Sequence, residues 1–209
     1  MSPSAFYYVF CTSMEHLASL NAVVIRQKST AFSGNKYVIC APGGGVLFYA
    51  KEDAGALNLV QGSSRAFNID IFDADNKQAS LIFIQILRRP YTFGPDKMDV
   101  KINGSLVSVV RVEPTFMKPV LNINDADDKR VLRVKGPMCQ DGEVDYEIFD
   151  KNKTRIGCIQ KQWSGIAREV FTDADNFMIT FPGDLDVRFK AAVIGTCLLI
   201  VNFYYYFSK

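Results

Sequence analysis

The chain has 209 residues, of which 48% are hydrophobic and 22% are charged, and its formal net charge is +2. This length supports one large all-β domain or two small ones, and the apolar content excludes an intrinsically disordered chain. A charge so close to neutral lacks the basic surface typical of nucleic-acid binding, so we expect no nucleic-acid partner. The single histidine, His16, excludes most Ser-His and Cys-His hydrolases. With no catalytic constellation elsewhere, we expect that the protein is not an enzyme.

The five cysteines and the N-terminus indicate the compartment. The cysteine count is odd and no C-x-x-C pair occurs, which predicts free thiols in a reducing environment. The apolar run from Phe6 to Phe10 has no basic residue before it, so it is not a secretory signal. We therefore expect a cytosol-facing chain, with residues 1–13 as a short N-terminal leader and residues 14–209 as one domain.

Short apolar or alternating runs, separated by turn residues, extend from about Leu17 to Phe181 and predict β-strands. Asn103-Gly104 predicts a two-residue hairpin turn, because Asn and Gly tolerate the positive φ of a type I′ turn. About a dozen such strands suit a closed barrel or a sandwich. The predicted strands cover residues 21–26, 36–40, 46–50, 67–72, 80–87, 98–102, 106–112, 119–123, 131–134, 144–149, 156–160, 166–171 and 177–181.

The tripeptide Asp-Ala-Asp occurs three times, at residues 73–75, 125–127 and 173–175. Asp side chains accept hydrogen bonds from the backbone two residues further on, so the tripeptide alone predicts a turn.

The pattern changes after Pro182-Gly183, where we predict a hydrophobic helix over residues 185–207. Asp184 is its predicted N-cap, and no charge occurs between Lys190 and Lys209. A helix that is apolar on every face must be buried in protein or in lipid. Two interpretations remain open from the residues alone: the helix is a core enclosed by the strands, or it is a short single-pass membrane span.

The segment from Asp173 to Asp184 is 12 residues long and has acidic residues at positions 1, 3 and 12. These are three of the positions at which an EF-hand loop places carboxylates for calcium. Phe177, Ile179 and Phe181 alternate like a strand, so only their main-chain carbonyls would serve as ligands. The spacing is therefore compatible with a weak calcium site and with a plain turn followed by a strand and a helix cap.

Several segments, taken in order, resemble the phospholipid scramblase family over about residues 14–207. The most specific block spans Gln162 to Val187, and earlier matches precede it in the same order. These matches are Asn35-Lys36-Tyr37, Ala50-Lys51-Glu52-Asp53, Gly136-Pro137 and Val144-Asp145-Tyr146-Glu147-Ile148. The resemblance implies a mainly β, tubby-like fold, in which a 12-stranded barrel surrounds a central hydrophobic C-terminal helix.

The same resemblance implies a function and a site. The expected function is calcium-dependent, ATP-independent, bidirectional movement of phospholipids between bilayer leaflets, at the cytoplasmic face of a membrane, with the plasma membrane expected. A homo-oligomer that forms with calcium is the expected assembly. The family's calcium segment, with Ca²⁺ as a low-affinity cofactor, falls on Asp173, Asp175, Phe177, Ile179, Phe181 and Asp184. The alternative is a tubby-like domain that binds anionic lipid headgroups through basic loops, such as Arg88-Arg89 and 151–155, without transporting lipid.

Overall fold

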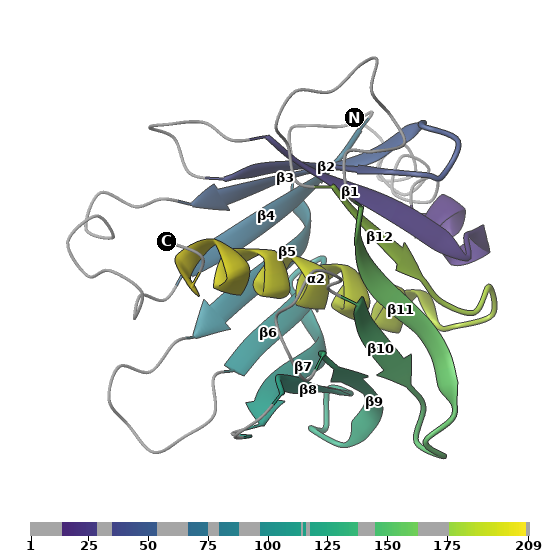
Figure 1. The fold of residues 1–209 in the computed structure, drawn as a ribbon. Helices are drawn as coiled ribbons and strands as arrows, with labels where there is room; N and C mark the ends of the chain where they lie inside the picture. The colour runs from purple at the N-terminus through teal and green to yellow at the C-terminus, as the bar shows by residue number, and fades with distance from the viewer. Residues whose placement is uncertain are drawn as a thin grey trace.

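The computed structural model describes residues 14–28, 35–53, 67–74, 80–87, 97–113, 115, 118–137, 145–162 and 176–207. These residues form twelve antiparallel strands and a long C-terminal helix, α2 (Val187–Phe207), preceded by a helical turn at residues 14–19 (Figure 1). The strands are β1 (Ala22–Lys28), β2 (Lys36–Cys40), β3 (Val46–Asp53), β4 (Phe67–Asp73), β5 (Ser80–Leu87), β6 (Lys97–Ile102), β7 (Ser105–Glu113), β8 (Val120–Asn124), β9 (Arg130–Lys135), β10 (Asp145–Phe149), β11 (Arg155–Gln162) and β12 (Asn176–Thr180). The predicted strand at 166–171 lies outside the described residues.

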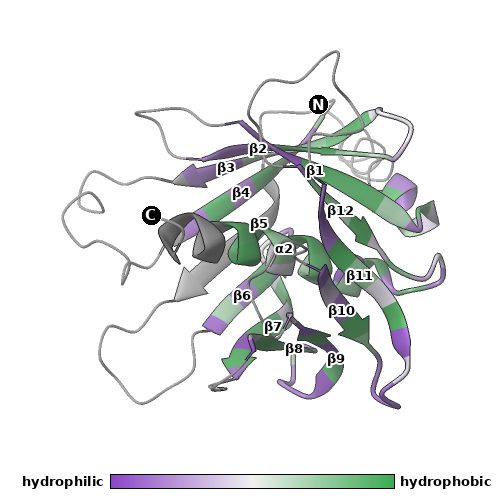
Figure 2. Ribbon diagram, in the orientation of Figure 1, coloured by the Kyte–Doolittle hydropathy of each residue, from purple (hydrophilic) through white to green (hydrophobic). Residues whose placement is uncertain are grey.

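The sheet closes into a barrel. Each strand pairs with its neighbours in the chain, and β1 pairs with both β2 and β12. Alternation places one set of side chains inside: β10 and β12 each have two buried residues between less buried ones, and hydrophobic and hydrophilic positions alternate along the strands (Figure 2). The predicted barrel is thereby confirmed.

Two turns follow the local chemistry that predicted them. Asn103 and Gly104 have φ values of 49° and 78°, and they connect β6 to β7. In the second Asp-Ala-Asp tripeptide, Asp125 Oδ1 accepts hydrogen bonds from the backbone N–H of Asp127 at 3.0 Å and of Lys129 at 2.9 Å. Both hairpin turns are confirmed.

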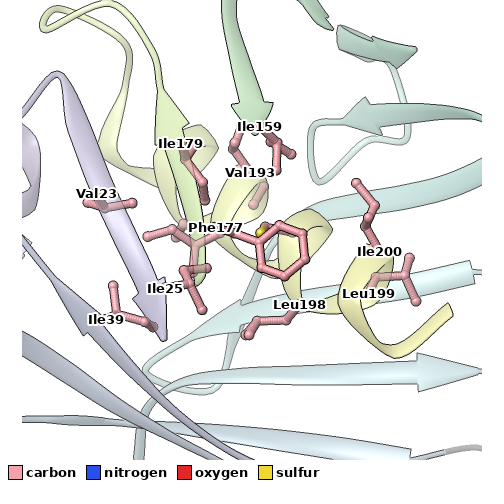
Figure 3. Packing of buried hydrophobic residues seen from close by; sticks show 14 of the residues in the cluster. Val23, Ile25, Ile39, Ile159, Phe177, Ile179, Val193, Leu198, Leu199 and Ile200 are labelled. Carbon is pink, nitrogen blue, oxygen red and sulfur yellow. The ribbon is translucent and has the colours of Figure 1, made fainter. Parts of the chain in front are cut away.

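The helix α2 lies inside the barrel. A barrel of twelve strands is wider than the eight-stranded barrels that side chains alone fill, so its interior needs another element. Every residue from Ala191 to Val201 is buried, and Figure 3 shows Val193, Leu198 and the Phe177 ring of β12 within the same core. Thr196, the polar residue in this stretch, donates its hydroxyl to the Ala192 carbonyl at 2.8 Å. The interpretation of the helix as the barrel's core is confirmed.

Within the described part of the chain, no helix combines the length and hydropathy that crossing a bilayer requires.

Candidate functional site

The strand β12 carries two of the residues predicted to bind calcium, Phe177 and Ile179, and a third, Phe181, follows it directly; β12 lies between β1 and β11. Phe177 is opposite Ile25 on one side and Lys161 on the other. The side chains of Phe177, Ile179 and Phe181 are 2%, 0% and 3% exposed, so they belong to the core. A strand paired on both sides directs its carbonyls into the two hydrogen-bonded ladders. The main-chain oxygens of β12 are therefore already partnered within the sheet.

The carboxylates of the predicted calcium segment are placed only in part. Asp184 is exposed, in the turn between β12 and α2, whereas Asp173 and Asp175 lie outside the described residues. Among the described residues, no group of three or more His, Cys, Asp or Glu side chains is arranged to hold a metal ion. Of the carboxylates in the predicted calcium segment, the structure describes one, the exposed Asp184, and the calcium site stays a prediction.

The helix begins later than the sequence predicts, and a different residue caps it. The Leu185 N–H donates to the Pro182 carbonyl at 3.1 Å, which holds residues 182–185 in a turn. Asp186 Oδ1 then accepts the N–H of Arg188 at 2.9 Å, and the Asp186 carbonyl accepts those of Phe189 and Lys190. Asp186 is therefore the N-cap, rather than Asp184, and α2 begins at Val187 rather than at residue 185.

Arg188 and Asp186 also form an ion pair at this helix end. Arg188 Nε lies 3.0 Å from Asp186 Oδ1, and Arg188 Nη2 lies 2.6 Å from Asp186 Oδ2. The hydrogen bonds from Arg188 hold the pKa of Asp186 below its usual value, even though burial opposes this shift. The carboxylate of Asp186 is thus already engaged by an arginine and by the helix backbone.

Lys190 connects α2 to the start of the domain. Its side chain is fully buried, and Nζ donates to the carbonyls of Ala18 at 2.6 Å, Leu20 at 2.7 Å and Gly183 at 2.7 Å. The ammonium group also lies 5.3 Å from the centre of the Phe181 ring. Burial lowers the pKa of Lys190, and Asp184 partly opposes this. One cation therefore joins the end of the 14–19 helical turn to the β12–α2 junction.

The sequence did not predict this role of Lys190, because its partners Ala18 and Leu20 are 172 and 170 positions away. The available signal was a lysine directly before the uncharged stretch 191–207 of the helix, since a buried ammonium requires oxygen partners.

The basic loops of the alternative function are also placed in part. Residues 151–154 form an exposed hairpin turn between β10 and β11, in which Asp150 Oδ1 accepts the N–H groups of Asn152 and Thr154, each at 2.8 Å. Arg155 forms a salt bridge with Glu147 at 3.2 Å. Arg88 and Arg89 lie outside the described residues.

Comparison with known proteins defines the class to which this barrel belongs. The chain belongs to the scramblase family, whose sequence profile, Scramblase, matches residues 9–209. This confirms the resemblance that the residues carry.

Individual relatives are named phospholipid scramblases. The chain is 32% identical to mouse phospholipid scramblase 1 over 203 residues, covering 90% of this chain and 62% of that protein. It is 32% identical to human phospholipid scramblase 1 over 208 residues, covering 90% of this chain and 64% of that protein. It is 31% identical to human phospholipid scramblase family member 5, covering 89% of this chain and 74% of that protein. The chain thus spans less than two thirds of the length of the scramblase 1 proteins it matches.

A solved structure shows the same fold. The X-ray structure of a protein from Arabidopsis thaliana, which has a tubby-like fold, matches with a TM-score of 0.50. The match covers 86% of this chain and 91% of that chain, at 14% sequence identity. At this identity the likeness concerns the fold alone.

Proposed function

We propose that this protein moves phospholipids between the leaflets of a membrane in response to calcium. The observation that carries the proposal is the family match over residues 9–209, which includes all twelve strands and α2. The relatives in this family are named phospholipid scramblases, and the match is not restricted to a short motif.

Calcium would be held by the carboxylates of Asp173, Asp175 and Asp184. The main-chain oxygens of Phe177 and Ile179 would join them only by giving up hydrogen bonds in the β12 ladders, whereas Phe181 follows the strand. A divalent cation supplies positive charge that draws this acidic segment together. A calcium site with so few charged ligands is expected to be weak, with a dissociation constant on the order of 10⁻⁴–10⁻³ M. Asp184 supports this proposal because it is exposed beside the start of α2.

A second candidate is lipid binding without transport, and the position of α2 favours it. The apolar residues of α2 from Ala191 to Val201 contact the barrel interior, so this surface is not available to lipid in the described state. Because a headgroup needs polar partners to cross the hydrocarbon core, transport by one closed barrel is difficult. Transport would then require calcium-driven self-association at the cytoplasmic face of the plasma membrane, which we propose as the assembly.

The experiment is a reconstitution into vesicles that contain a fluorescent phospholipid in both leaflets. Dithionite reduces only the fluorophores it reaches, so transport exposes the inner-leaflet lipid and increases the bleached fraction. We expect an increase with millimolar calcium and none in protein-free vesicles. Binding to the vesicles without additional bleaching would reject transport and support the second candidate.

A matched pair of variants tests the calcium site. Asp173→Ala should remove the calcium response, whereas Asp127→Ala, in the same tripeptide within a structural turn, should retain it. Sedimentation velocity with and without calcium tests the assembly. A calcium response that persists in Asp173→Ala would place the ion elsewhere.

A further inference from the structure

A hollow on the outer surface of the barrel lies over β1 to β4. It has a volume of about 290 Å³, and its lining includes Lys28, Lys36 and Lys51 together with Val38, Tyr49 and Phe72. These residues come from four adjacent strands. Gln27 and Ile71, the sequence neighbours of Lys28 and Phe72, are buried, which places Lys28 and Phe72 on the outer face of the sheet. The buried residues Tyr37 and Ala50 complete the lining.

The three lysines form a row across neighbouring strands. Lys28 is opposite Lys36 in the β1–β2 ladder, and Lys36 is opposite Lys51 in the β2–β3 ladder. Neighbouring strands lie about 4.8 Å apart, so the backbone positions of the three lysines share a span of about 10 Å. Like charges directly opposite each other destabilise a sheet. Within the described part of the chain, no carboxylate forms a salt bridge with any of the three.

Asp70 does not neutralise this row. It is opposite Lys51 in the β3–β4 ladder, yet the two side chains form no salt bridge. Among the described residues, the ammonium groups of the row are therefore not engaged in ion pairs, although the Asp70 carboxylate lies on the neighbouring strand.

A buried polar network holds the strand ends behind the lysines. Asn35 Nδ2 donates to Glu52 Oε2 at 2.8 Å, and the Glu52 N–H donates to the Asn35 carbonyl at 2.9 Å. Gln27 Nε2 donates to Asn35 Oδ1 at 3.3 Å. Each member is adjacent in sequence to one lysine of the row. Because these bonds tie β1, β2 and β3 together, the lysines keep their mutual spacing despite their repulsion.

The next set of paired residues on the same face of the sheet is apolar. Val38 is opposite Tyr49, and Tyr49 is opposite Phe72. An anion held by the lysines would thus rest its carbon skeleton against a valine and two aromatic rings. This combination of a cationic edge and an apolar floor matches an amphiphilic phosphate compound better than a free inorganic ion.

The number of donors selects the kind of headgroup. A phosphate monoester presents three terminal acceptor oxygens and about 1.5 to 2 negative charges at neutral pH, so each lysine can have an oxygen partner, whereas a phosphodiester has two such oxygens and one charge. The row also lies at the barrel end toward which β3 points, where the C-terminal end of α2 emerges (Figure 1).

We propose that the hollow over β1–β4 binds the headgroup of a membrane lipid that carries a phosphate monoester, with Lys28, Lys36 and Lys51 as its cationic contacts. The proposal rests on the proposed association with phospholipid membranes, but it does not depend on transport. It predicts that binding requires the lysine row even in vesicles where no lipid crosses the bilayer.

The test is vesicle cosedimentation of the full chain. Phosphatidylcholine vesicles containing phosphatidic acid, a phosphate monoester lipid, are compared with phosphatidylserine vesicles of equal total charge. We expect tighter binding to phosphatidic acid. We also expect that Lys36→Gln weakens this binding about fivefold, since one lysine near an anionic surface contributes about 1 kcal/mol. Lys129→Gln, in the exposed β8–β9 turn, is the matched control and should bind like the wild type.

Two further measurements separate loss of lipid binding from loss of the fold, and a membrane lipid from a soluble phosphate ester as the ligand. Removal of the central lysine relieves repulsion, so Lys36→Gln should unfold at a higher urea concentration than the wild type while binding less lipid. Glycerol 3-phosphate should compete weakly, because it lacks the membrane; full competition at low concentration would identify a soluble phosphate ester as the ligand instead. Equal binding to both vesicle types, or equal binding by Lys36→Gln and the wild type, would overturn the proposal. Loss of transport with intact, lysine-dependent binding would overturn only the proposed function.

Discussion

Replacement of Lys190 by methionine tests whether one buried cation holds the two ends of the domain together. Methionine has a similar length and fits an apolar environment, but it has no donor for the carbonyls of Ala18, Leu20 and Gly183. Each unpaired buried carbonyl costs about 1–3 kcal/mol. These three are partly buried, so we use the lower end and expect a loss of about 3 kcal/mol in the free energy of unfolding.

The loss can be measured by urea unfolding followed by circular dichroism. With a slope of about 2 kcal/mol per molar urea, the midpoint should fall by about 1.5 M. Hydrogen exchange should also accelerate at the amides of residues 14–19, because Lys190 holds the end of that helical turn. Lys151→Met, at an exposed turn position, is the control and should change stability by less than about 0.5 kcal/mol. A midpoint shift below about 0.5 M would show that the desolvation of the ammonium cancels its hydrogen bonds, and would refute the reasoning.

Three further substitutions test other parts of the barrel. Hydrogen bonds from Arg111 and Asn124 lower the pKa of Asp128 from 3.8 to about 2. The contribution of this carboxylate to stability is therefore present above pH 4 and lost as the pH falls toward 2. Asp128→Asn should lower the free energy of unfolding by about 1 kcal/mol or less at pH 7, because the side chain is 41% exposed. The difference in stability between Asp128→Asn and the wild type should vanish near pH 2, as measured by acid-titration unfolding. Gly157→Ala should lower the melting temperature by several degrees, since its Cβ would lie 2.1 Å from the Thr180 carbonyl oxygen, whereas Gly43→Ala, where a Cβ meets nothing within 4 Å, should not. Leu198→Ala should cost about 2–5 kcal/mol in chemical unfolding, because the side chain is fully buried; a cost below 1 kcal/mol would contradict the position of α2 in the core.

Local chemistry was sufficient to predict most of the barrel. Turn signals such as Asn103-Gly104 act over two residues, and the alternation of β12 acts over five, so both could be recognised from the chain alone. The environment of α2 could not, because a helix that is apolar on all faces has no periodicity that distinguishes a protein core from lipid. Its first turn was also misplaced, since Asp184 and Asp186 are both acceptable caps and only the Pro182–Leu185 turn selects the second.

The lysine row and the Lys190 contacts depend on tertiary structure. Lys28, Lys36 and Lys51 become neighbours only through the registers of three strands, and an irregularity in the β2–β3 ladder near Cys40 shows that such registers are not fixed by simple counting. The predicted calcium ligands present a different case. The structure places Phe177, Ile179 and Phe181 in the core, and it leaves the carboxylates of Asp173 and Asp175 undescribed, so that part of the site stays a prediction.

The position of α2 in the chain has a consequence for biosynthesis. The ribosome makes all twelve strands before it makes the helix that they enclose, and the bond from Lys190 to Leu20 connects residues separated by 170 positions. Until α2 emerges, inward-facing residues such as Ile25 and Ile71 have no core to contact. Such non-local assembly is slow and leaves apolar strands exposed to other chains. We therefore expect this barrel to fold only once α2 has left the ribosome, and a chain that stops before Val187 to aggregate rather than to form a smaller stable domain.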